Sequence, residues 1–247
     1  MIISSKQNDL IKYLNSLKET KNIKREGLCF VETRKVVGDL MKQGLILELF
    51  LTEKNRDLSD GFNGKTTFVS NEIAHYLSET KTNDGVFGIA KIRPQGEITH
   101  DKVLVLDNVQ DPTNVGSIIR SAVAFGYLDI IMIGGAYPYS PKVVRSSMGH
   151  VFNVNLFFYT YTNLVDFITK NKYNLIKADL EGENLNTFSP IKPFALAIGN
   201  EGQGISDEVS RLSSASVNIP MDSMVESLNA SVSAGIIMYE INNKLEK

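Results

Sequence analysis

The chain has 247 residues, of which 43% are hydrophobic, and a formal net charge of −2, so it suits one α/β unit or two small domains with a sizeable core. Its only cysteine, Cys29, rules out an intramolecular disulfide, and its three histidines are too far apart in sequence for metal-ligand spacing, so no metal is expected. The absence of a run of about 18 apolar residues and of a signal-peptide pattern predicts a cytoplasmic protein without a membrane partner.

The first part of the chain alternates between helical and strand patterns. Apolar residues recur at helical spacing near its start, which predicts an amphipathic helix. The predicted elements of this part are helix 7–22, strand 28–31, helix 33–43, strand 46–52 and helix 71–78. This order predicts a compact α/β domain over residues 1–92, followed by a polar linker at 93–100.

The first 35 residues are the basic part of the chain. They hold 8 lysines and arginines against 4 acidic residues. Such a segment can follow the phosphates of an RNA, although charge alone fits a solvated helix face equally well.

The second part, residues 101–247, has a regular rhythm of strands and helices. The predicted elements are strand 103–107, helix 114–125, strand 130–134, a helical segment at 140–149, strand 153–158, helix 163–170, strand 174–179, strand 194–199, helix 205–213, strand 216–220 and a helix from 228. Strands rich in β-branched residues that alternate with helices predict a mostly parallel sheet covered on both faces.

The first motif, NVGSIIR, opens the helix after the first of these strands. Asn114 takes the position of the helix N-cap, and Gly126 is the predicted residue at which the helix terminates. Gly116 and Arg120 are four residues apart and therefore lie on one face of the helix. Taken singly, these residues fit an ordinary cap and a surface arginine.

The second motif, IGNEGQG, lies where a buried-type strand runs into glycines around Asn200 and Glu201. Ligands of parallel sheets bind beyond the carboxyl ends of strands, where glycines let backbone amides reach them. The G-x-x-G-x-G spacing differs from that of dinucleotide-binding folds, and no Gly-Lys-Ser/Thr follows. A carboxylate and an amide at a sheet edge favour a ligand site over a plain turn.

The third motif consists of IPM and then ESLNASV. A strand ends at Pro220, and Glu226 precedes the start of the last helix. Serine and asparagine are ordinary capping residues at a helix start. The small residues that follow are less ordinary, and they predict close packing against another backbone or subunit.

In this order, N-V-G-x-I-x-R, I-G-N-E-G-x-G and I-P-M…E-S-L-N-x-S-V resemble the three motifs of the SpoU (TrmH) RNA 2′-O-ribose methyltransferases. The resemblance covers nearly the whole chain. Residues 101–247 look like the SPOUT catalytic domain, and LSETKTNDGVFGIA at 77–90 looks like part of the RNA substrate-binding domain that precedes it. YSPKVVRSSMG at 139–149 is similar to a segment of the ribosomal-RNA members.

The resemblance implies a small N-terminal α/β RNA-binding domain and a C-terminal SPOUT domain with a trefoil knot near its C-terminus. It also implies S-adenosyl-L-methionine as cofactor and a homodimer that completes the site. The residues at the family's cofactor positions are Ala178, Gly199, Asn200, Gly202, Ile219 and Leu228. The residues at its catalytic and site-organising positions are Asn114, Arg120, Glu201, Ser227 and Asn229.

RNA contacts are predicted in the N-terminal domain and in the 139–149 segment. The basic residues predicted for them are Lys24, Arg25, Arg34 and Arg145. Two positions depart from the family pattern, because Thr33 stands where glycine is common after Glu32, and Asp84 where a proline-glutamine pair is commoner. Both departures lie in the RNA-binding half. They therefore leave the identity of the target RNA open, but they do not affect the predicted reaction.

Methyl transfer from a sulfonium is an in-line displacement, so the protein must position and activate the 2′-hydroxyl. Arg120 is predicted to matter most, by binding the target's phosphate and stabilising the developing alkoxide, because a guanidinium is a poor general base. The proton acceptor is that phosphate, Glu201 or water, and Glu201 is expected to orient Arg120. Ser227 and Asn229 are expected to orient the ribose or the cofactor carboxylate.

The sequence therefore predicts methyl transfer from S-adenosylmethionine to a ribose 2′-hydroxyl, most simply in ribosomal RNA. A single-stranded or looped target is expected, because the ribose must be splayed into a pocket. Two alternatives remain open: a transfer-RNA methyltransferase, and a non-catalytic RNA-binding protein of ribosome assembly.

Overall fold

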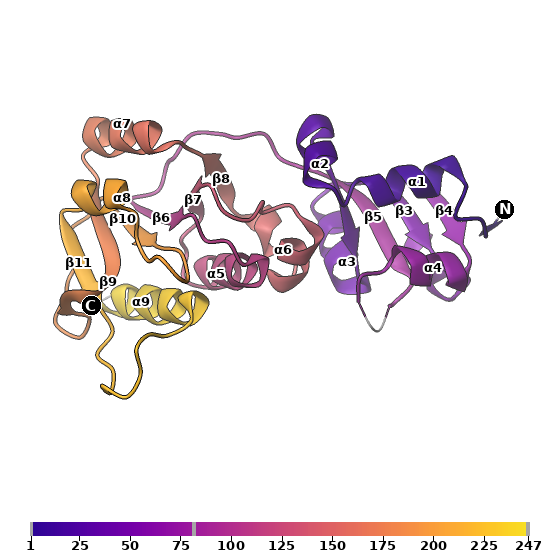
Figure 1. The fold of residues 1–247 in the computed structure, drawn as a ribbon. Coiled ribbons are helices and arrows are strands. Elements are labelled where there is room, and N and C mark those ends of the chain that lie inside the picture. The colour runs from indigo at the N-terminus through magenta and orange to yellow at the C-terminus, as the bar shows by residue number, and fades with distance from the viewer. Residues whose placement is uncertain (1, 81–82, 246–247) are drawn as a thin grey trace. The chain divides into compact units, whose positions relative to one another are not determined.

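The computed structural model describes residues 2–80 and 83–245, so two residues of the LSETKTNDGVFGIA segment lie outside the described part of the chain. The chain divides into two compact units, coloured along the chain in Figure 1. One unit consists of Met1–Pro94 and Tyr139–Phe152, and the other of Gln95–Pro138 and Asn153–Lys247. None of the described helices has both the length and the apolar character needed to cross a membrane.

The N-terminal unit is built on a mixed sheet of five strands. Its strands are β1 (Ile2–Ile3), β2 (Leu28–Glu32), β3 (Ile46–Leu51), β4 (Lys65–Val69) and β5 (Val86–Lys91). Its helices are α1 (Asp9–Ser16), α2 (Thr20–Glu26), α3 (Arg34–Lys42), the 3₁₀ helix η1 (Glu53–Ser59) and α4 (Asn71–Leu77). The strand order is β1-β4-β3-β5-β2, and β5 runs antiparallel to both of its neighbours.

Helices α1 and α4 pack on this sheet and enclose its core. Ile11 and Leu14 of α1 lie in one apolar cluster with Ile73 of α4 and with Phe30 and Phe50 of the sheet. Burial of apolar surface of this kind is the main stabilising contribution to a small domain.

The single helix predicted over 7–22 is two helices in the structure. The Ser16 hydroxyl donates to the carbonyl oxygen of Tyr13 over 2.7 Å, and the Asn22 amide donates to the carbonyl oxygen of Ser16 over 3.0 Å. Such bonds between side chains and the backbone compete with continuation of a helix. The chain therefore turns after α1 and begins α2 at Thr20.

The C-terminal unit is built on six parallel strands. Its strands are β6 (Lys102–Asp107), β7 (Asp129–Ile133), β8 (Asn155–Phe158), β9 (Asn174–Asn184), β10 (Phe194–Ile198) and β11 (Ala215–Asn218). Its helices are α5 (Pro112–Ala124), α7 (Tyr161–Asn171), α8 (Asp207–Leu212) and α9 (Ala230–Leu245). The strand order is β11-β9-β10-β6-β7-β8, and every pairing is parallel, as predicted.

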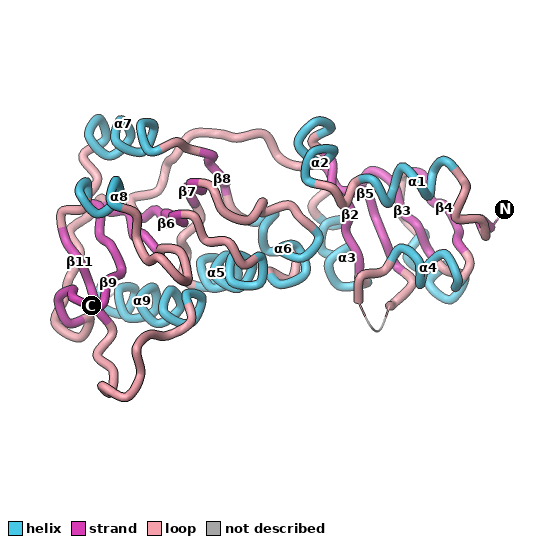
Figure 2. The backbone as a smooth tube through the Cα atoms, viewed as in Figure 1, coloured by secondary structure: helices cyan, strands magenta, loops and turns pink. Residues whose placement is uncertain are grey.

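Helices cover both faces of this sheet, which makes three layers (Figures 1 and 2). On one face, Leu164 and Ile168 of α7 and Val209 of α8 join the apolar cluster of the central strands. On the other face, α5 and α9 pack against each other (Figure 2). The sheet is thereby buried on both sides, which explains the apolar runs in its strands.

Residues 139–152 pack with the N-terminal unit, although the sequence placed them in the catalytic domain at 101–247. Helix α6 (Pro141–Ser146) lies in this segment and packs against β2, and the 3₁₀ helix η2 (His150–Asn153) follows it. The prediction followed chain order, whereas the buried side chains of Val143 and Val144 lie in a segment that belongs to the N-terminal unit.

The C-terminal end of the predicted linker at 93–100 is held by hydrogen bonds to a buried carboxylate. The backbone N–H groups of Thr99 and His100 donate to the Asp129 carboxylate over 2.9 and 3.0 Å. The Asn155 amide donates to the same carboxylate over 2.7 Å, and Asp129 is fully buried. The C-terminal end of the linker is therefore part of the C-terminal unit.

Candidate active site

The connections after β6 and β10 meet at the carboxyl ends of these neighbouring strands. The Asn200 amide donates to the carbonyl oxygen of Asn108 over 2.9 Å. The N–H group of Ser206 donates to the carboxylate of Asp107, the last residue of β6, over 2.7 Å. These bonds fasten the second motif to the loop that leads into the first.

The helix of the first motif begins earlier than predicted. Asp111 is its N-cap and accepts from the Thr113 N–H over 2.8 Å, and Pro112 is its first residue. Aspartate followed by proline is a strong helix start, because it combines a capping oxygen with a preset φ angle. Asn114, the predicted N-cap, therefore lies within the helix. Gly126 follows the helix with a φ of 70°, as predicted.

One residue from each motif joins a continuous hydrogen-bond network. The Asn114 amide donates to Oε1 of Glu201 over 2.8 Å, and its side-chain oxygen accepts from the Asn229 amide over 2.9 Å. Asn114 is buried, so water does not compete freely for these bonds. The oxygen of Asn229 accepts in turn from the backbone and the hydroxyl of Ser231 in α9. The network thus joins segments that are distant in sequence.

The carboxylate of Glu201 is held by N–H donors. Besides Asn114, the backbone N–H groups of Gln110 and Asp111 donate to it over 3.2 and 3.3 Å. Burial alone would raise the pKa of Glu201, but these hydrogen bonds outweigh it and lower the pKa below its ordinary value. Glu201 thus fixes the start of α5. Within the described residues its partners are Asn114 and these two N–H groups, so the expected orientation of Arg120 by Glu201 stays a prediction.

A cavity of about 480 Å³ adjoins the second motif, and this volume is typical of a small-molecule site. The six residues predicted for the cofactor all line it, namely Ala178, Gly199, Asn200, Gly202, Ile219 and Leu228. Glu201 and Ser227 of the predicted catalytic set also line it. Leu180, Ile198 and Ile237 add apolar walls. The described residues contain no cluster of His, Cys, Asp or Glu suited to a metal ion.

The loop after β10 closes on itself. The backbones of Asn200 and Gly204 exchange two hydrogen bonds of 2.9 Å, and Oδ1 of Asn200 accepts from the N–H groups of Gly202 and Gln203. A Cβ atom at Gly199 would lie 2.4 Å from the backbone of Gly204, so only glycine fits there. The loop is therefore a compact wall of the cavity made largely of backbone.

Seven polar residues of the cavity wall were not predicted, and three of them form one cluster. The ammonium group of Lys177 lies 2.5 Å from the carboxylate of Asp179 and donates to the Ser210 hydroxyl over 2.9 Å. The hydrogen bond from Lys177 lowers the pKa of Asp179. The charged residues on both sides of Ala178, at the predicted strand end, were a usable signal. Ser210 offered none, because its place at the cavity depends on how α8 packs.

Arg120 lies on the exposed side of α5. No hydrogen bond or ion pair involves it within residues 2–80 and 83–245. Arg120, Asn114 and Asn229 lie outside the cavity lining. The guanidinium is therefore open to a substrate that approaches α5.

The predicted RNA-contact residues differ in their surroundings. Lys24 and Arg25 are exposed in the last turn of α2, and Arg25 forms an ion pair with the adjacent Glu26. Arg34 forms an ion pair with Asp57. Lys24, Arg25 and Arg34 all remain at the surface of the N-terminal unit.

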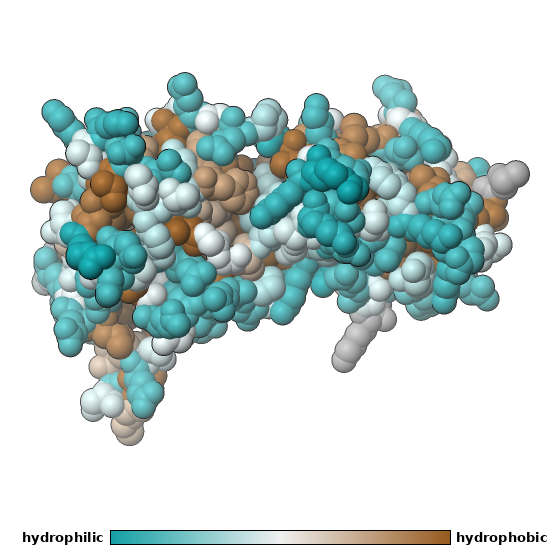
Figure 3. All heavy atoms as spheres, turned by 45° about the horizontal axis from the view of Figure 1, so that its top comes forward, coloured by the Kyte–Doolittle hydropathy of each residue, from teal (hydrophilic) through white to brown (hydrophobic). Residues whose placement is uncertain are grey.

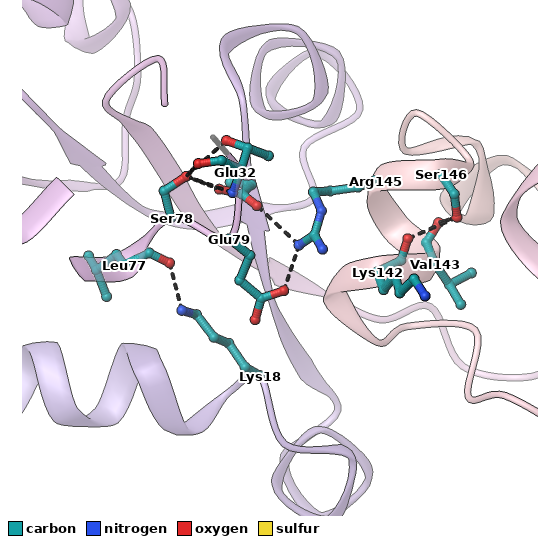
Figure 4. A network of polar contacts seen from close by, with 10 residues as sticks. Lys18, Glu32, Leu77, Ser78, Glu79, Lys142, Val143, Arg145 and Ser146 are labelled. Carbon is teal, nitrogen blue, oxygen red and sulfur yellow. Dashed lines mark hydrogen bonds and ion pairs between the residues drawn. The ribbon is translucent and has the colours of Figure 1, made fainter. Parts of the chain in front are cut away.

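Arg145 differs from the other three because carboxylates enclose it (Figure 4). Its guanidinium lies 3.1 Å from Glu32 and 2.7 Å from Glu79, and its side chain is 23% exposed. Glu32 is buried and also accepts from the Ser78 hydroxyl over 2.9 Å. Arg145 therefore joins α6 to the rest of the N-terminal unit.

Comparisons with known proteins agree with this arrangement. The chain is 28% identical to the 23S rRNA (guanosine(2553)-2′-O)-methyltransferase RlmP of Bacillus subtilis, over 97% of this chain and 98% of the relative. It is 30% identical to an uncharacterized tRNA/rRNA methyltransferase of Synechocystis, over 96% of this chain and 92% of the relative.

Solved structures match along the whole chain as well. The AdoMet-bound SpoU methyltransferase AviRb from Streptomyces viridochromogenes matches with a TM-score of 0.89 and 25% identity, over 98% of this chain and 99% of that chain. The AdoMet-bound rRNA methyltransferase from Sinorhizobium meliloti matches with a TM-score of 0.87 and 26% identity, over 99% and 98%.

These matches confirm the predicted SPOUT fold class, whereas the trefoil knot stays a prediction. The model of the SpoU rRNA Methylase family matches residues 101–239, more than half of the chain. The protein therefore belongs to the SpoU rRNA methylase family.

Proposed function

We propose that this chain transfers a methyl group from S-adenosylmethionine to the ribose 2′-hydroxyl of a nucleotide in ribosomal RNA. The observation that carries the proposal is the meeting of Asn114, Glu201 and Asn229, one residue from each motif, next to a cavity of cofactor size. The Bacillus relative and the AdoMet-bound neighbours support the same reaction. The protein would act in the cytoplasm, where ribosomal RNA is found.

The cavity suits a ligand that combines a flat aromatic base with a charged amino-acid tail. Apolar side chains such as Leu180 and Ile219 line part of it, and the ion pair of Lys177 and Asp179 lines another part. The close approach at Gly199 leaves backbone groups, and not side chains, at the wall. A mixed lining of this kind fits S-adenosylmethionine, which we place among the six predicted cofactor residues.

When bound, S-adenosylmethionine supplies a methyl group on a positively charged sulfur, so the electrophile comes with the ligand. Asn114 holds Glu201 and Asn229, and this network fixes the start of α5 against the cavity wall. Ser227 lines the cavity and is placed to orient the ribose or the cofactor carboxylate. Such positioning can remove several kcal/mol from the barrier of a displacement.

Arg120 supplies the positive charge that the transfer reaction needs next to the target nucleotide. Its guanidinium stays protonated, so it binds the phosphate of the target nucleotide and stabilises the alkoxide that forms as the 2′-hydroxyl loses its proton. Glu201 is already bound by three N–H groups, so the phosphate or water is the better proton acceptor.

The test of the reaction is methyl transfer to ribosomal RNA from labelled S-adenosylmethionine, with calorimetry of cofactor binding. We expect Arg120→Ala to lower kcat roughly 100-fold and to leave cofactor affinity unchanged. Arg211→Ala, at an exposed arginine of α8, is the matched control, and its kcat and cofactor affinity should equal those of the wild type. Undetectable binding of S-adenosylmethionine by the wild type would refute the proposal that this chain is a methyltransferase. Near-normal turnover of Arg120→Lys at high pH would refute the need for a guanidinium.

The target is tested by mapping 2′-O-methylation in cells with and without the gene. We expect one ribosomal-RNA position to lose its methyl group. Loss of a methyl group from transfer RNA instead would make the chain a transfer-RNA methyltransferase. No change in either RNA would favour a non-catalytic role in ribosome assembly.

The N-terminal unit is proposed to hold the RNA through Lys24, Arg25 and Arg34. Because phosphate contacts release counterions, replacing Lys24 and Arg25 by alanine should weaken RNA binding and reduce its dependence on salt. Arg145 was predicted for the same role, but its two ion pairs favour a structural role.

A homodimer is proposed through α9 and the loop before it. Val232, Ile236 and Tyr239 of α9 are 47%, 38% and 53% exposed, and Met224 in the loop is 88% exposed. Figure 3 shows brown, apolar residues among hydrophilic ones over the surface that it draws. Exposed apolar residues that cluster on one helix are typical of an interface.

Analytical ultracentrifugation tests the homodimer. Ile236→Glu should give monomers, whereas Ile191→Glu, at an isoleucine that is 75% exposed outside α9, should leave the dimer intact. A monomeric wild type at working concentration would refute the proposal.

A further inference from the structure

Two aromatic rings stack at the carboxyl ends of β7 and β8. Tyr137 lies in the connection after β7, and Phe158 is the last residue of β8. Their ring centroids are 5.9 Å apart and their planes differ by 25°, so the two rings are nearly parallel. Phe158 is 47% exposed although its partner covers part of it. The pair therefore presents a flat apolar surface to solvent in an orientation fixed by stacking.

This aromatic pair is tied to the proposed site of methyl transfer. The N–H group of Ala136, next to Tyr137, donates to the carbonyl oxygen of Val109 over 2.9 Å. A Cβ atom at Gly135 would lie 2.3 Å from the same carbonyl oxygen, so the two loops are in direct contact. Val109 immediately precedes Gln110, whose N–H group binds Glu201. The loop after β7 is therefore fastened to the loop that holds Glu201.

The sheet order sets the spacing between the pair and the first motif. β6, β7 and β8 are consecutive parallel strands, so their carboxyl ends lie along one edge of the sheet. Neighbouring strands are about 4.8 Å apart, which puts the end of β8 about 10 Å from the end of β6. The pair therefore lies on the same edge of the sheet as the loop that leads into the first motif, so an RNA strand that runs along this edge can contact both.

A shallow depression lies against Phe158. It measures about 440 Å³, and its lining residues are Gln95, Phe158, Tyr159, Asn163, Asp166, Phe167, Lys170 and Asn171. The ammonium group of Lys170 lies 3.5 Å from the carboxylate of Asp166. Tyr137 is not among the described lining residues, so the depression meets a part of Phe158 that the stacked partner leaves open. Aromatic rings bind the face of an unpaired base, and side-chain amides such as those of Asn163 and Asn171 bind its edge.

Single exposed aromatic residues are common on protein surfaces and need no function. This one differs in its fixed stacking, its adjoining depression and its link to the first motif. We propose that Phe158 is a stacking site for an unpaired base of the RNA substrate, next to the nucleotide that is methylated. The inference rests on the proposed function, because it assumes an RNA substrate.

The chain contains no tryptophan, so one introduced tryptophan reports on its own surroundings alone. Phe158→Trp keeps a stacking ring, and a base stacked on it should quench its fluorescence when the ribosomal-RNA transcript is added. Val165→Trp, at a position of α7 that is 43% exposed and outside the depression, is the matched control and should keep its emission. Unchanged emission of Phe158→Trp while the transcript is bound would overturn the proposal.

Binding and kinetics give a second measurement. Phe158→Ala and Phe158→Leu should each weaken transcript binding roughly tenfold and raise the KM for RNA, with the affinity for S-adenosylmethionine unchanged. Phe158→Tyr should restore binding, because it restores a ring. If Phe158→Leu binds RNA like the wild type, an apolar contact suffices and stacking is wrong. A wild type without activity on any RNA would instead contradict the proposed function itself.

Discussion

Thr33 adopts a backbone conformation that threonine avoids. Its φ is 83° and its ψ is 141°, yet its hydroxyl caps α3 by accepting from the Val36 N–H over 3.4 Å. The second departure from the family pattern lies beside it, since Asp84 accepts from the N–H group of Arg34 over 3.1 Å. The two unusual residues therefore belong to one local arrangement. The sequence showed that each departs from the family pattern, but it did not show that they lie next to each other.

Replacing Thr33 by glycine should stabilise the protein. Glycine adopts positive φ without strain, and this gain exceeds the loss of a long capping bond, so we expect about 1 kcal/mol in the free energy of unfolding. Thr33→Ala is the control, because it removes the cap and keeps the positive φ, and it should bring no gain. Urea denaturation measures both. Equal stabilisation by alanine would show that the strain is not the cause.

Asp129 should make stability depend on pH at the acid end. Burial alone would raise its pKa, but hydrogen bonds from Asn155, His100 and the Thr99 N–H outweigh burial and lower it. A lowered pKa stabilises the fold above the ordinary value near 3.9, and this stabilisation is lost as pH falls through the folded-state pKa. We expect Asp129→Asn to cost about 3 kcal/mol at pH 7.

The cost of Asp129→Asn should shrink as the pH falls below about 4. Urea denaturation of both proteins at several pH values measures it. Asp166→Asn is the control, because that carboxylate is exposed and forms an ion pair with Lys170 within α7. A cost of Asp129→Asn that stays constant down to pH 3 would contradict the assignment.

At the scale of elements, the close packing of the loop after β10 can be tested by substituting its glycines. Gly199→Ala places a methyl group 2.4 Å from the backbone of Gly204, so the loop must open and the cavity wall must shift. We expect the affinity for S-adenosylmethionine to fall at least tenfold by calorimetry. At Gly202 a Cβ atom meets nothing closer than 3.7 Å, so Gly202→Ala should have a far smaller effect. If Gly199→Ala and Gly202→Ala bind S-adenosylmethionine with equal affinity, the loop after β10 does not contribute to cofactor binding in the way proposed.

The elements of the C-terminal unit could be predicted because each buried strand is a continuous apolar run between helices. In the N-terminal unit, β4, β5 and the two-residue strand β1 were missed. β4 is only partly buried, so its pattern is weak, and β5 is interrupted by Gly88. The cavity residues followed from the family motifs. The network through Asn114 did not, because it depends on side-chain geometry at a helix start that the sequence placed later.

At the scale of the whole molecule, the chain passes between the two units three times, near residues 94, 138 and 152. The excursion at 139–152 carries α6, whose Arg145 lies against the buried Glu32. A single boundary along the chain therefore does not describe these two compact units. The excursion and the rest of the N-terminal unit should unfold together.

Arg145→Ala tests this coupling. It leaves the carboxylate of Glu32 buried without its guanidinium, which should cost about 2–3 kcal/mol in the free energy of unfolding. Arg25→Ala removes an ion pair of an arginine that is 70% exposed and should cost at most about 0.5 kcal/mol. The cofactor cavity belongs to the C-terminal unit, so calorimetry should show unchanged S-adenosylmethionine affinity in both. If Arg145→Ala weakens RNA binding with no loss of stability, Arg145 contacts RNA directly, as the sequence first suggested.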